Sequence, residues 1–163
     1  MLRTLKNRTA KTGERDKGFT LIELMVVVMI IAVLLAIAIP TFLGTQNKAK
    51  DRSAQSSLRN TVTAAKTIYT DGSDYTKATN VALTSAEPSL TFVVAATASD
   101  DAKTVSVTST ATVFYAATKS AGGTCYYIKD DVNGGTTYAK GSGACNGTTA
   151  ALATTVYSAT GWS

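Results

Sequence analysis

Histidine is absent from this chain of 163 residues, and cysteine and proline occur only twice each. Without histidine the chain has no Ser-His-Asp triad, no Cys-His pair and no histidine-ligated metal site. It also has no glycine-rich loop for cradling phosphate and no carboxylate pair on an identifiable framework. We therefore expect a protein that is not an enzyme and that binds neither a cofactor nor a metal.

Positive charge is concentrated at the amino end of the chain. A net charge of +5 and an isoelectric point near 9.2 would suit nucleic acid or an acidic membrane surface as a partner. Residues 1–18 hold six basic and two acidic side chains, which leaves ten basic and nine acidic side chains in residues 19–163. The body of the chain is thus almost neutral, and we do not expect nucleic acid as its direct ligand.

The strongest signal is an apolar run over residues 19–39, in which only Thr20 and Glu23 are polar. Its 21 residues match the number that a helix needs to cross a bilayer. The basic segment before the run modestly favours a cytoplasmic amino terminus. Two other interpretations stay open, namely a plain single-pass anchor and a secretory signal cleaved after Ala38, where small residues satisfy the cleavage rule.

The helix is predicted to continue beyond the apolar run. Pro40 and Gly44 are expected to bend or loosen it, because a proline removes a backbone hydrogen bond and crowds the preceding turn. The alternative is that the helix ends at Pro40. Residues 40–70 have the pattern of an amphipathic helix, with apolar side chains that recur on one face: Ala54, Leu58, Val62, Ala65 and Tyr69. One helix over residues 20–69 would be about 75 Å long, so we expect its hydrophobic half to protrude from so small a domain.

The composition changes after residue 70. Turn residues at 71–74 stop the helix, and the chain then becomes rich in Thr, Val, Ala, Ser and Tyr. Four strands are predicted between turn signals: residues 90–95, 104–108, 112–116 and 124–129. Residues 152–157 are a further candidate strand. We predict an α+β fold in which residues 71–163 form a small antiparallel sheet packed on the amphipathic stripe.

Residues 18–40 read GFTLIELMVVVMIIAVLLAIAIP, which closely resembles the amino-terminal signature of type IV pilins and related pseudopilins. The likeness combines a basic leader ending at Gly18, Phe19 as first mature residue, Glu23 as the fifth, an apolar span, and Pro40 where the family bends its helix. It covers about the first 50 residues, and the remainder matches only in outline. The resemblance implies the type IV pilin fold, a long hydrophobic helix joined to a β-rich head.

The resemblance also implies how the chain is processed. A prepilin peptidase would cut between Gly18 and Phe19, remove residues 1–18 as a leader, and leave a Phe19 amine that is then N-methylated. This amine is positive and lies at the end of a helix whose dipole is positive there, so it calls for a nearby anion. Glu23 would neutralise the Phe19 amine of a neighbouring subunit during assembly. The alternative is an interfacial carboxylate without a partner.

Cys125 and Cys145 follow a membrane-targeting segment, and an even pair there indicates a disulfide formed outside the cytoplasm. Closing the loop of residues 125–145 would stabilise the domain by roughly 3 kcal/mol. Its position resembles the C-terminal disulfide loop of many pilins, which is usually exposed on the filament and takes part in packing or adhesion. Two free thiols are the alternative.

Two weaker signals lie in the same region. Four aspartates suggest calcium, but their spacing does not fit an EF-hand and they lie in turns, so no metal site is predicted: Asp71, Asp74, Asp130 and Asp131. Residues 146–148, Asn-Gly-Thr, match a glycosylation sequon, which is too short a motif to rely on.

These observations together predict a structural subunit of a type IV pilus. It would begin as a single-pass precursor in the cytoplasmic membrane and end in an extracellular filament of identical subunits. The resemblance implies three further partners, namely the prepilin peptidase, an assembly ATPase and a platform protein. The alternatives are a pseudopilin of a type II secretion system or a DNA-uptake pilin and, from a different class, a membrane-anchored binding domain.

Overall fold

The computed structural model describes residues 18–152 and 155–162. The chain falls into two compact units, Met1–Thr41 and Phe42–Ser163, and each is described by itself. Of the expected leader, only Gly18 belongs to the described residues, and residues 1–17 lie outside them.

Helix α1 (Leu21–Gly72) begins in the first unit and ends in the second. It confirms the predicted long helix and stops two residues after position 70, where Ser73 takes a positive φ of 50°. Pro40 lies inside α1, so the alternative that the helix ends at this proline is wrong.

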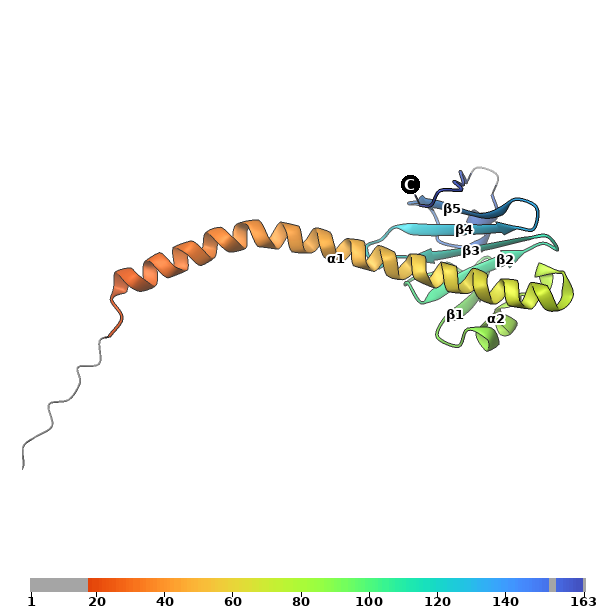
Figure 1. Ribbon diagram of the computed structural model, residues 1–163, viewed down its shortest axis with the longest axis horizontal. Coiled ribbons are helices and arrows are strands. Elements are labelled where there is room, and N and C mark those ends of the chain that lie inside the picture. The colour runs from red at the N-terminus through yellow and green to blue at the C-terminus, as the bar shows by residue number, and fades with distance from the viewer. Residues whose placement is uncertain (1–17, 153–154, 163) are drawn as a thin grey trace, which may run out of the picture. The chain divides into compact units, whose positions relative to one another are not determined.

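The second unit adds a 3-10 helix, two short α-helices and five strands to the end of α1 (Figure 1). Their bounds are η1 (Tyr75–Lys77), α2 (Asn80–Ala86), β1 (Thr91–Val94), β2 (Thr104–Ser109), β3 (Val113–Lys119), β4 (Cys125–Asp131), β5 (Gly135–Gly141) and α3 (Gly147–Ala151). The four predicted strands are therefore present, whereas β5 and the two short helices were not predicted. No strand occurs among the described residues of 152–157, and residues 153–154 lie outside the description.

The strands lie side by side in sequence order, β1-β2-β3-β4-β5. The pairs from β2 to β5 are antiparallel, as predicted, but β1 and β2 are parallel. Residues 95–103 carry the chain back to the starting end of β1, and Ser99 holds this loop against β3 by accepting a 2.9 Å hydrogen bond from the Lys119 amide. The prediction of a wholly antiparallel sheet is wrong at this one pair.

One face of the sheet packs on the second-unit part of α1 (Figure 1). The predicted stripe is confirmed, because four of its members are buried and Tyr69 packs on the same cluster: Ala54, Leu58, Val62 and Ala65. On the sheet side the cluster includes Val105, Phe114, Tyr126 and Ile128. Burying one leucine of this kind contributes about 1.5–3 kcal/mol, so the stripe is the main attachment of the helix to the sheet.

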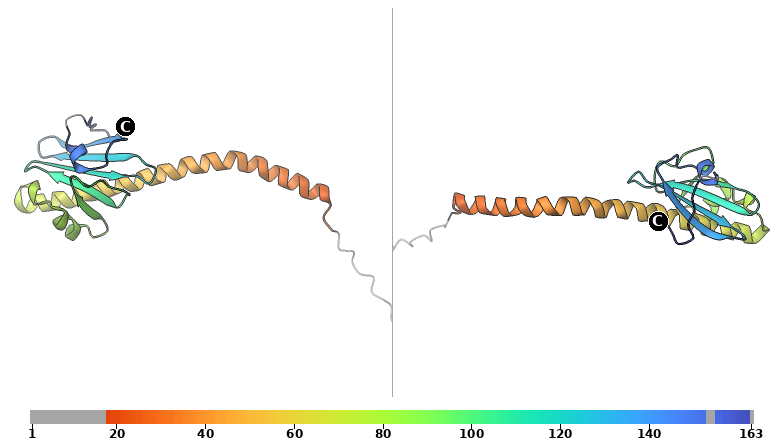
Figure 2. Two further views of the ribbon diagram at one scale, coloured as in Figure 1. Left: turned by 180° about the vertical axis from the view of Figure 1, so that it is seen from behind. Right: turned by 90° about the horizontal axis from the view of Figure 1, so that it is seen from above.

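The opposite face of the sheet has a second apolar cluster that the sequence did not predict. The segment after β5 covers it, and α3 packs on β2, β3 and β4; Figure 2 shows α1 and α3 on opposite sides of the sheet. The cluster consists of Ala117, Cys125, Tyr127, Ala139, Cys145 and Ala150. The sheet is thus buried on both faces, and the C-terminal segment supplies the second layer.

The C-terminal segment covers the middle of the β5 edge. Ser158 exchanges two backbone hydrogen bonds with Tyr138 of β5, of 2.8 and 2.9 Å. Trp162 then packs against Tyr138 and Tyr126, its indole N–H donates to a carbonyl of β4, and the Arg59 guanidinium of α1 lies 5.0 Å from its ring centre. The tail therefore joins the sheet edge to the helix.

Candidate functional site

The predicted cleavage position lies just before α1. Gly18 and Phe19 are outside the helix and exposed, and the Phe19 side chain is 79% accessible. Apart from its chain neighbours, no described residue has an atom within 4 Å of the position that a Cβ at Gly18 would occupy. The described residues therefore do not obstruct the Gly18–Phe19 bond.

Thr20 and Glu23 form a capping box at the start of α1. The Thr20 hydroxyl accepts from the Glu23 amide, and Glu23 Oε2 accepts from both the amide and the hydroxyl of Thr20, all at 3.2 Å. Such reciprocal bonds satisfy amide groups that have no partner within the helix. The pattern Thr-x-x-Glu is readable in the sequence, although the sequence analysis assigned no role to Thr20.

Glu23 therefore has a structural role in the single chain. Its negative charge lies in the first turn of α1, where the helix dipole favours an anion. Only Oε2 is used by the cap, and Oε1 has no hydrogen-bond partner among the described residues. A carboxylate can accept several hydrogen bonds, so the capped side chain keeps one oxygen for a second donor.

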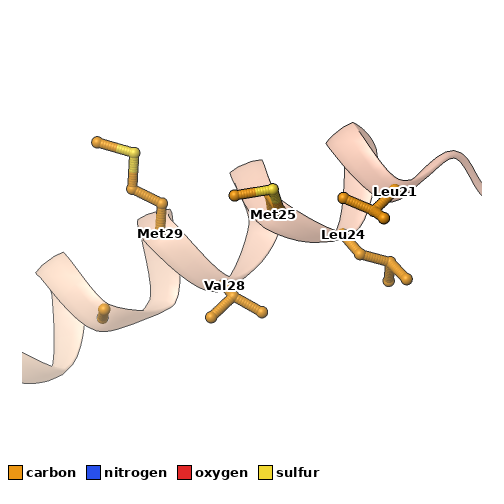
Figure 3. A pocket seen from close by; sticks show the side chains of 6 residues that line it. Leu21, Leu24, Met25, Val28 and Met29 are labelled. Carbon is orange, nitrogen blue, oxygen red and sulfur yellow. The ribbon is translucent and has the colours of Figure 1, made fainter.

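The apolar side chains that follow Glu23 are exposed in the first unit. Figure 3 shows Leu21, which precedes Glu23, and four of the side chains that follow it projecting from the helix around a shallow apolar groove: Leu24, Met25, Val28 and Met29. Within the described residues, α1 is the one helix that is long and apolar enough to cross a membrane. So large an exposed apolar surface needs a membrane or protein partner.

Pro40 and Gly44 both lie within α1. The missing amide of Pro40 leaves the helix one hydrogen bond short, and next to it the Thr41 hydroxyl donates to the Ile37 carbonyl at 3.1 Å. This side-chain bond supplies a donor in the turn that the proline disrupts. A bend at these residues stays a prediction.

Cys125 and Cys145 are joined by a disulfide, which excludes the alternative of two free thiols. The bridge connects the first residue of β4 with the segment that leads into α3, and both cysteines are buried, at 2% and 4% exposure. It therefore pins the C-terminal layer to the sheet. The sequence predicts an exposed loop between the two cysteines, but the disulfide that closes this loop is buried in the second apolar cluster.

Three of the four aspartates considered for calcium cap a helix, hold a turn or lie in a buried network, whereas Asp71 lies in the last turn of α1 and not in a loop. Asp74 caps η1, and Asp131 accepts from the amides of the β4–β5 turn. The described part of the chain contains no group of three or more His, Cys, Asp or Glu side chains placed to hold a metal ion.

Asp130 is the centre of a buried polar network that sequence reasoning missed. Its carboxylate accepts from the hydroxyls of Tyr75 and Thr136, each at 2.5 Å, and pairs with the Lys66 ammonium at 2.9 Å. Burial alone would raise the pKa of Asp130, but the hydrogen bonds from Thr136, Tyr75 and Lys66 outweigh it and hold this pKa below its ordinary value. Burial and the Asp130 carboxylate together raise the pKa of Tyr75.

A second polar contact lies further back along α1. The Ser120 hydroxyl, in the β3–β4 turn, donates to Asp51 of the helix at 2.5 Å and accepts from the Gly122 amide at 3.0 Å. Together with the Lys66–Asp130 pair it tethers α1 to the sheet at two points along the helix, one before the apolar stripe and one near its far end. These tethers fix which part of the helix faces the sheet.

Comparisons with known proteins find a sequence motif and relatives that belong to one kind of protein. The prokaryotic N-terminal methylation motif matches residues 14–39, which include the whole capping box. The chain is 41% identical over 73 residues to the type IV major pilin protein PilA of Myxococcus xanthus, covering 45% of this chain and 33% of that protein.

Two further relatives extend the comparison. Over 110 residues the chain is 32% identical to the type IV wide pilus major component PilA4 of Thermus thermophilus, covering 65% of this chain and 84% of that protein. Over 70 residues it is 33% identical to the type II secretion system core protein G of Pectobacterium carotovorum, covering 43% of this chain and 45% of that protein. The chain thus spans less than half of the Myxococcus and Pectobacterium proteins and most of the Thermus one. No solved structure matches the chain.

Proposed function

Because this chain belongs to the type IV pilin family, we propose that it is the structural subunit of a type IV pilus. The observation that carries the proposal is the amino end of α1, where an exposed Gly18–Phe19 bond precedes a capped carboxylate and a bare apolar helix. The chain would act by assembly and not by catalysis. Identical subunits would polymerise into a filament on the cell surface.

Processing would begin at the membrane. A prepilin peptidase would cut between Gly18 and Phe19, and the amine of Phe19 would be methylated. Until then the precursor would cross the cytoplasmic membrane once through residues 19–39, with the leader inside the cell and residues 71–163 outside. An assembly ATPase and a platform protein would then add the processed subunit to the filament.

Assembly would transfer the apolar surface of residues 19–39 from lipid to neighbouring helices. Within such a bundle an isolated charge is costly, and paired charges are tolerated. Glu23 would present its free Oε1 to the Phe19 amine of a neighbouring subunit, while Thr20 holds Oε2. The capping box would therefore orient the carboxylate as well as close the helix end.

Two substitutions separate the charge of Glu23 from its role as a cap. Glu23→Gln keeps an oxygen that can accept from Thr20, whereas Glu23→Val removes both the acceptor and the charge. We expect both variants to be cleaved and inserted, and both to yield far fewer sheared filaments than the parent chain. Normal filament yield in Glu23→Gln would refute the pairing of Glu23 with the Phe19 amine. If only Glu23→Val lost filaments, the role of Glu23 in assembly would be that of a helix cap.

Two related functions differ in where the polymer is found. A pseudopilin of a type II secretion system is favoured by the likeness to core protein G, and a DNA-uptake pilin would share the same amino end. If the chain is a pseudopilin, its deletion should stop the secretion of folded proteins, and the cells should carry no surface filament made of it. A membrane-anchored binding domain, from a different class, would remain a full-length monomer.

Intact mass and N-terminal sequence of protein sheared from the producing cells test the proposal. A disulfide-bonded chain that begins at methylated Phe19 in the sedimentable fraction is the expected result. A chain beginning at Met1 and confined to membranes would overturn it in favour of the anchored domain. A chain beginning at Ile39 would identify an ordinary secreted protein.

A further inference from the structure

The chain contains two Asn-Gly dipeptides, Asn133-Gly134 and Asn146-Gly147, in opposite structural settings. Glycine has no side chain to hinder attack on the preceding residue, and its backbone is the most mobile of all residues. Asn-Gly is therefore the dipeptide in which an asparagine most readily loses its amide. Whether it does so in a folded protein depends on how firmly both residues are held.

Asn133 and Gly134 lie in the exposed turn between β4 and β5. Residues 132–134 connect the paired residues Asp131 and Gly135, and Gly135 takes a φ of 72°, a left-handed conformation that glycine adopts without strain. Among the described residues the Asn133 side chain has no hydrogen-bond partner, and the Gly134 amide makes one long bond of 3.3 Å to the Asp131 carboxylate.

Asn146 and Gly147 are held firmly in comparison. Asn146 Oδ1 caps α3 by accepting from the Thr149 amide at 2.8 Å, and the buried Gly147 amide donates to Ser106 Oγ at 2.9 Å. Gly147 is also packed against backbone atoms of Val107. Bringing the Gly147 nitrogen to the side-chain carbon of Asn146 would break both hydrogen bonds and disturb this contact.

We propose that Asn133 is a site of spontaneous deamidation in the folded protein and that Asn146 is protected. The backbone nitrogen of Gly134 attacks Cγ of Asn133, so that an N–Cγ bond forms and the Cγ–Nδ2 bond breaks. Ammonia leaves with the proton that the Gly134 nitrogen gives up. Water then opens the cyclic imide at either carbonyl and leaves aspartate or isoaspartate at position 133.

The product changes the charge of a defined surface. The turn adjoins a shallow pocket whose lining includes Lys66, Tyr75, Asp130, Asp131 and Gly135. A new carboxylate there adds to the negative charge beside the single ion pair that joins α1 to β4 within the described residues. This chemistry belongs to the folded chain whether or not it polymerises, and the new charge accumulates with time.

Peptide mass spectrometry of the disulfide-bonded full chain, kept in detergent at mildly alkaline pH for days, tests the proposal. We expect the peptide containing Asn133 to gain the mass of an amide-to-acid exchange and to split into two chromatographic peaks. It should convert at least about tenfold faster than the peptide containing Asn146, which must open locally first. The reduced and denatured chain is the reference, in which both sites should convert at similar rates.

Gly134→Ala provides a matched variant. The atoms nearest to an added Cβ at Gly134 belong to the Asp131 side chain and lie at 3.5 Å or more, and Gly134 does not have a positive φ, so the fold should be kept. Its conversion at Asn133 should fall several-fold while its melting temperature stays unchanged. The proposal is overturned if folded Asn133 stays intact while the denatured chain converts, if Asn146 converts as fast in the folded chain, or if Gly134→Ala converts at the parent rate.

Discussion

Replacing Asp130 by asparagine should destabilise the second unit by about 2–3 kcal/mol. Asparagine has nearly the same shape, but its Nδ2 donates a hydrogen bond where a carboxylate oxygen accepts one. The Tyr75 hydroxyl is buried, and leaving it without an acceptor costs about 1–3 kcal/mol. Lys66 is 49% exposed, so water replaces much of its ion pair and this pair contributes little to the total.

The assay is thermal unfolding of the full chain in detergent, followed by the fluorescence of Trp162. This indole packs on Tyr126 and Tyr138 and therefore reports the sheet and its edge. For a unit of this size, a loss of 2–3 kcal/mol corresponds to a melting temperature lower by roughly 6–15 °C. Asp131→Asn is the matched control, because its side chain can still accept from the turn amides, and it should change stability by less than about 0.5 kcal/mol.

The stabilisation by Asp130 should depend on pH in a defined direction. The folded-state pKa of Asp130 lies below its ordinary value, so its contribution to stability is complete above the unfolded-state pKa, near 4. It is lost as the pH falls through the lower folded-state pKa. The difference in free energy of unfolding between the parent chain and Asp130→Asn should therefore become smaller below about pH 4. If the two chains are equally stable at pH 7, or if the difference in their stability does not change with pH, the stabilising role of the Asp130 carboxylate is refuted.

Three further predictions concern the rest of the chain. Gly147→Ala should cost about 1–3 kcal/mol, because an added Cβ would lie 2.9 Å from a backbone carbon of β2, while Gly134→Ala should melt like the parent. Serine at both Cys125 and Cys145 should lower stability by roughly 3 kcal/mol in denaturant titrations, and an unchanged midpoint would contradict this. Pro40→Ala should stiffen the helix and reduce filament extension under force, and unchanged mechanics would count against a bend.

Helix α1 was predictable because its signals are local and strong. The apolar run of 19–39 and the stripe that includes Leu58 and Val62 both follow from spacing, and turn residues mark the end near Gly72. The capping box was equally readable from Thr20 and Glu23. Neither role predicted for Glu23, a partner for an amine or an unpaired interfacial carboxylate, includes this cap.

The second layer of the sheet could not be read in the same way. Strand β5 shows no apolar alternation, because Ala139 is its only buried residue, and it exists by pairing with β4. The five residues of α3 are too few for a periodicity and form against the second core. The parallel pairing of β1 with β2 depends on the return path of residues 95–103, which no local propensity specifies.

The edges of the sheet bear on how the protein polymerises. An open strand edge invites another chain to add a strand, but here Ser158 pairs with β5 and the opposite edge strand, β1, has only four residues. The large exposed apolar surface lies instead on α1, on the side chains that follow Glu23. Because the sheet offers little open edge and the apolar part of the helix is exposed, the chain is suited to assemble through the helix. The sheet edges then offer little surface that would compete with the helix.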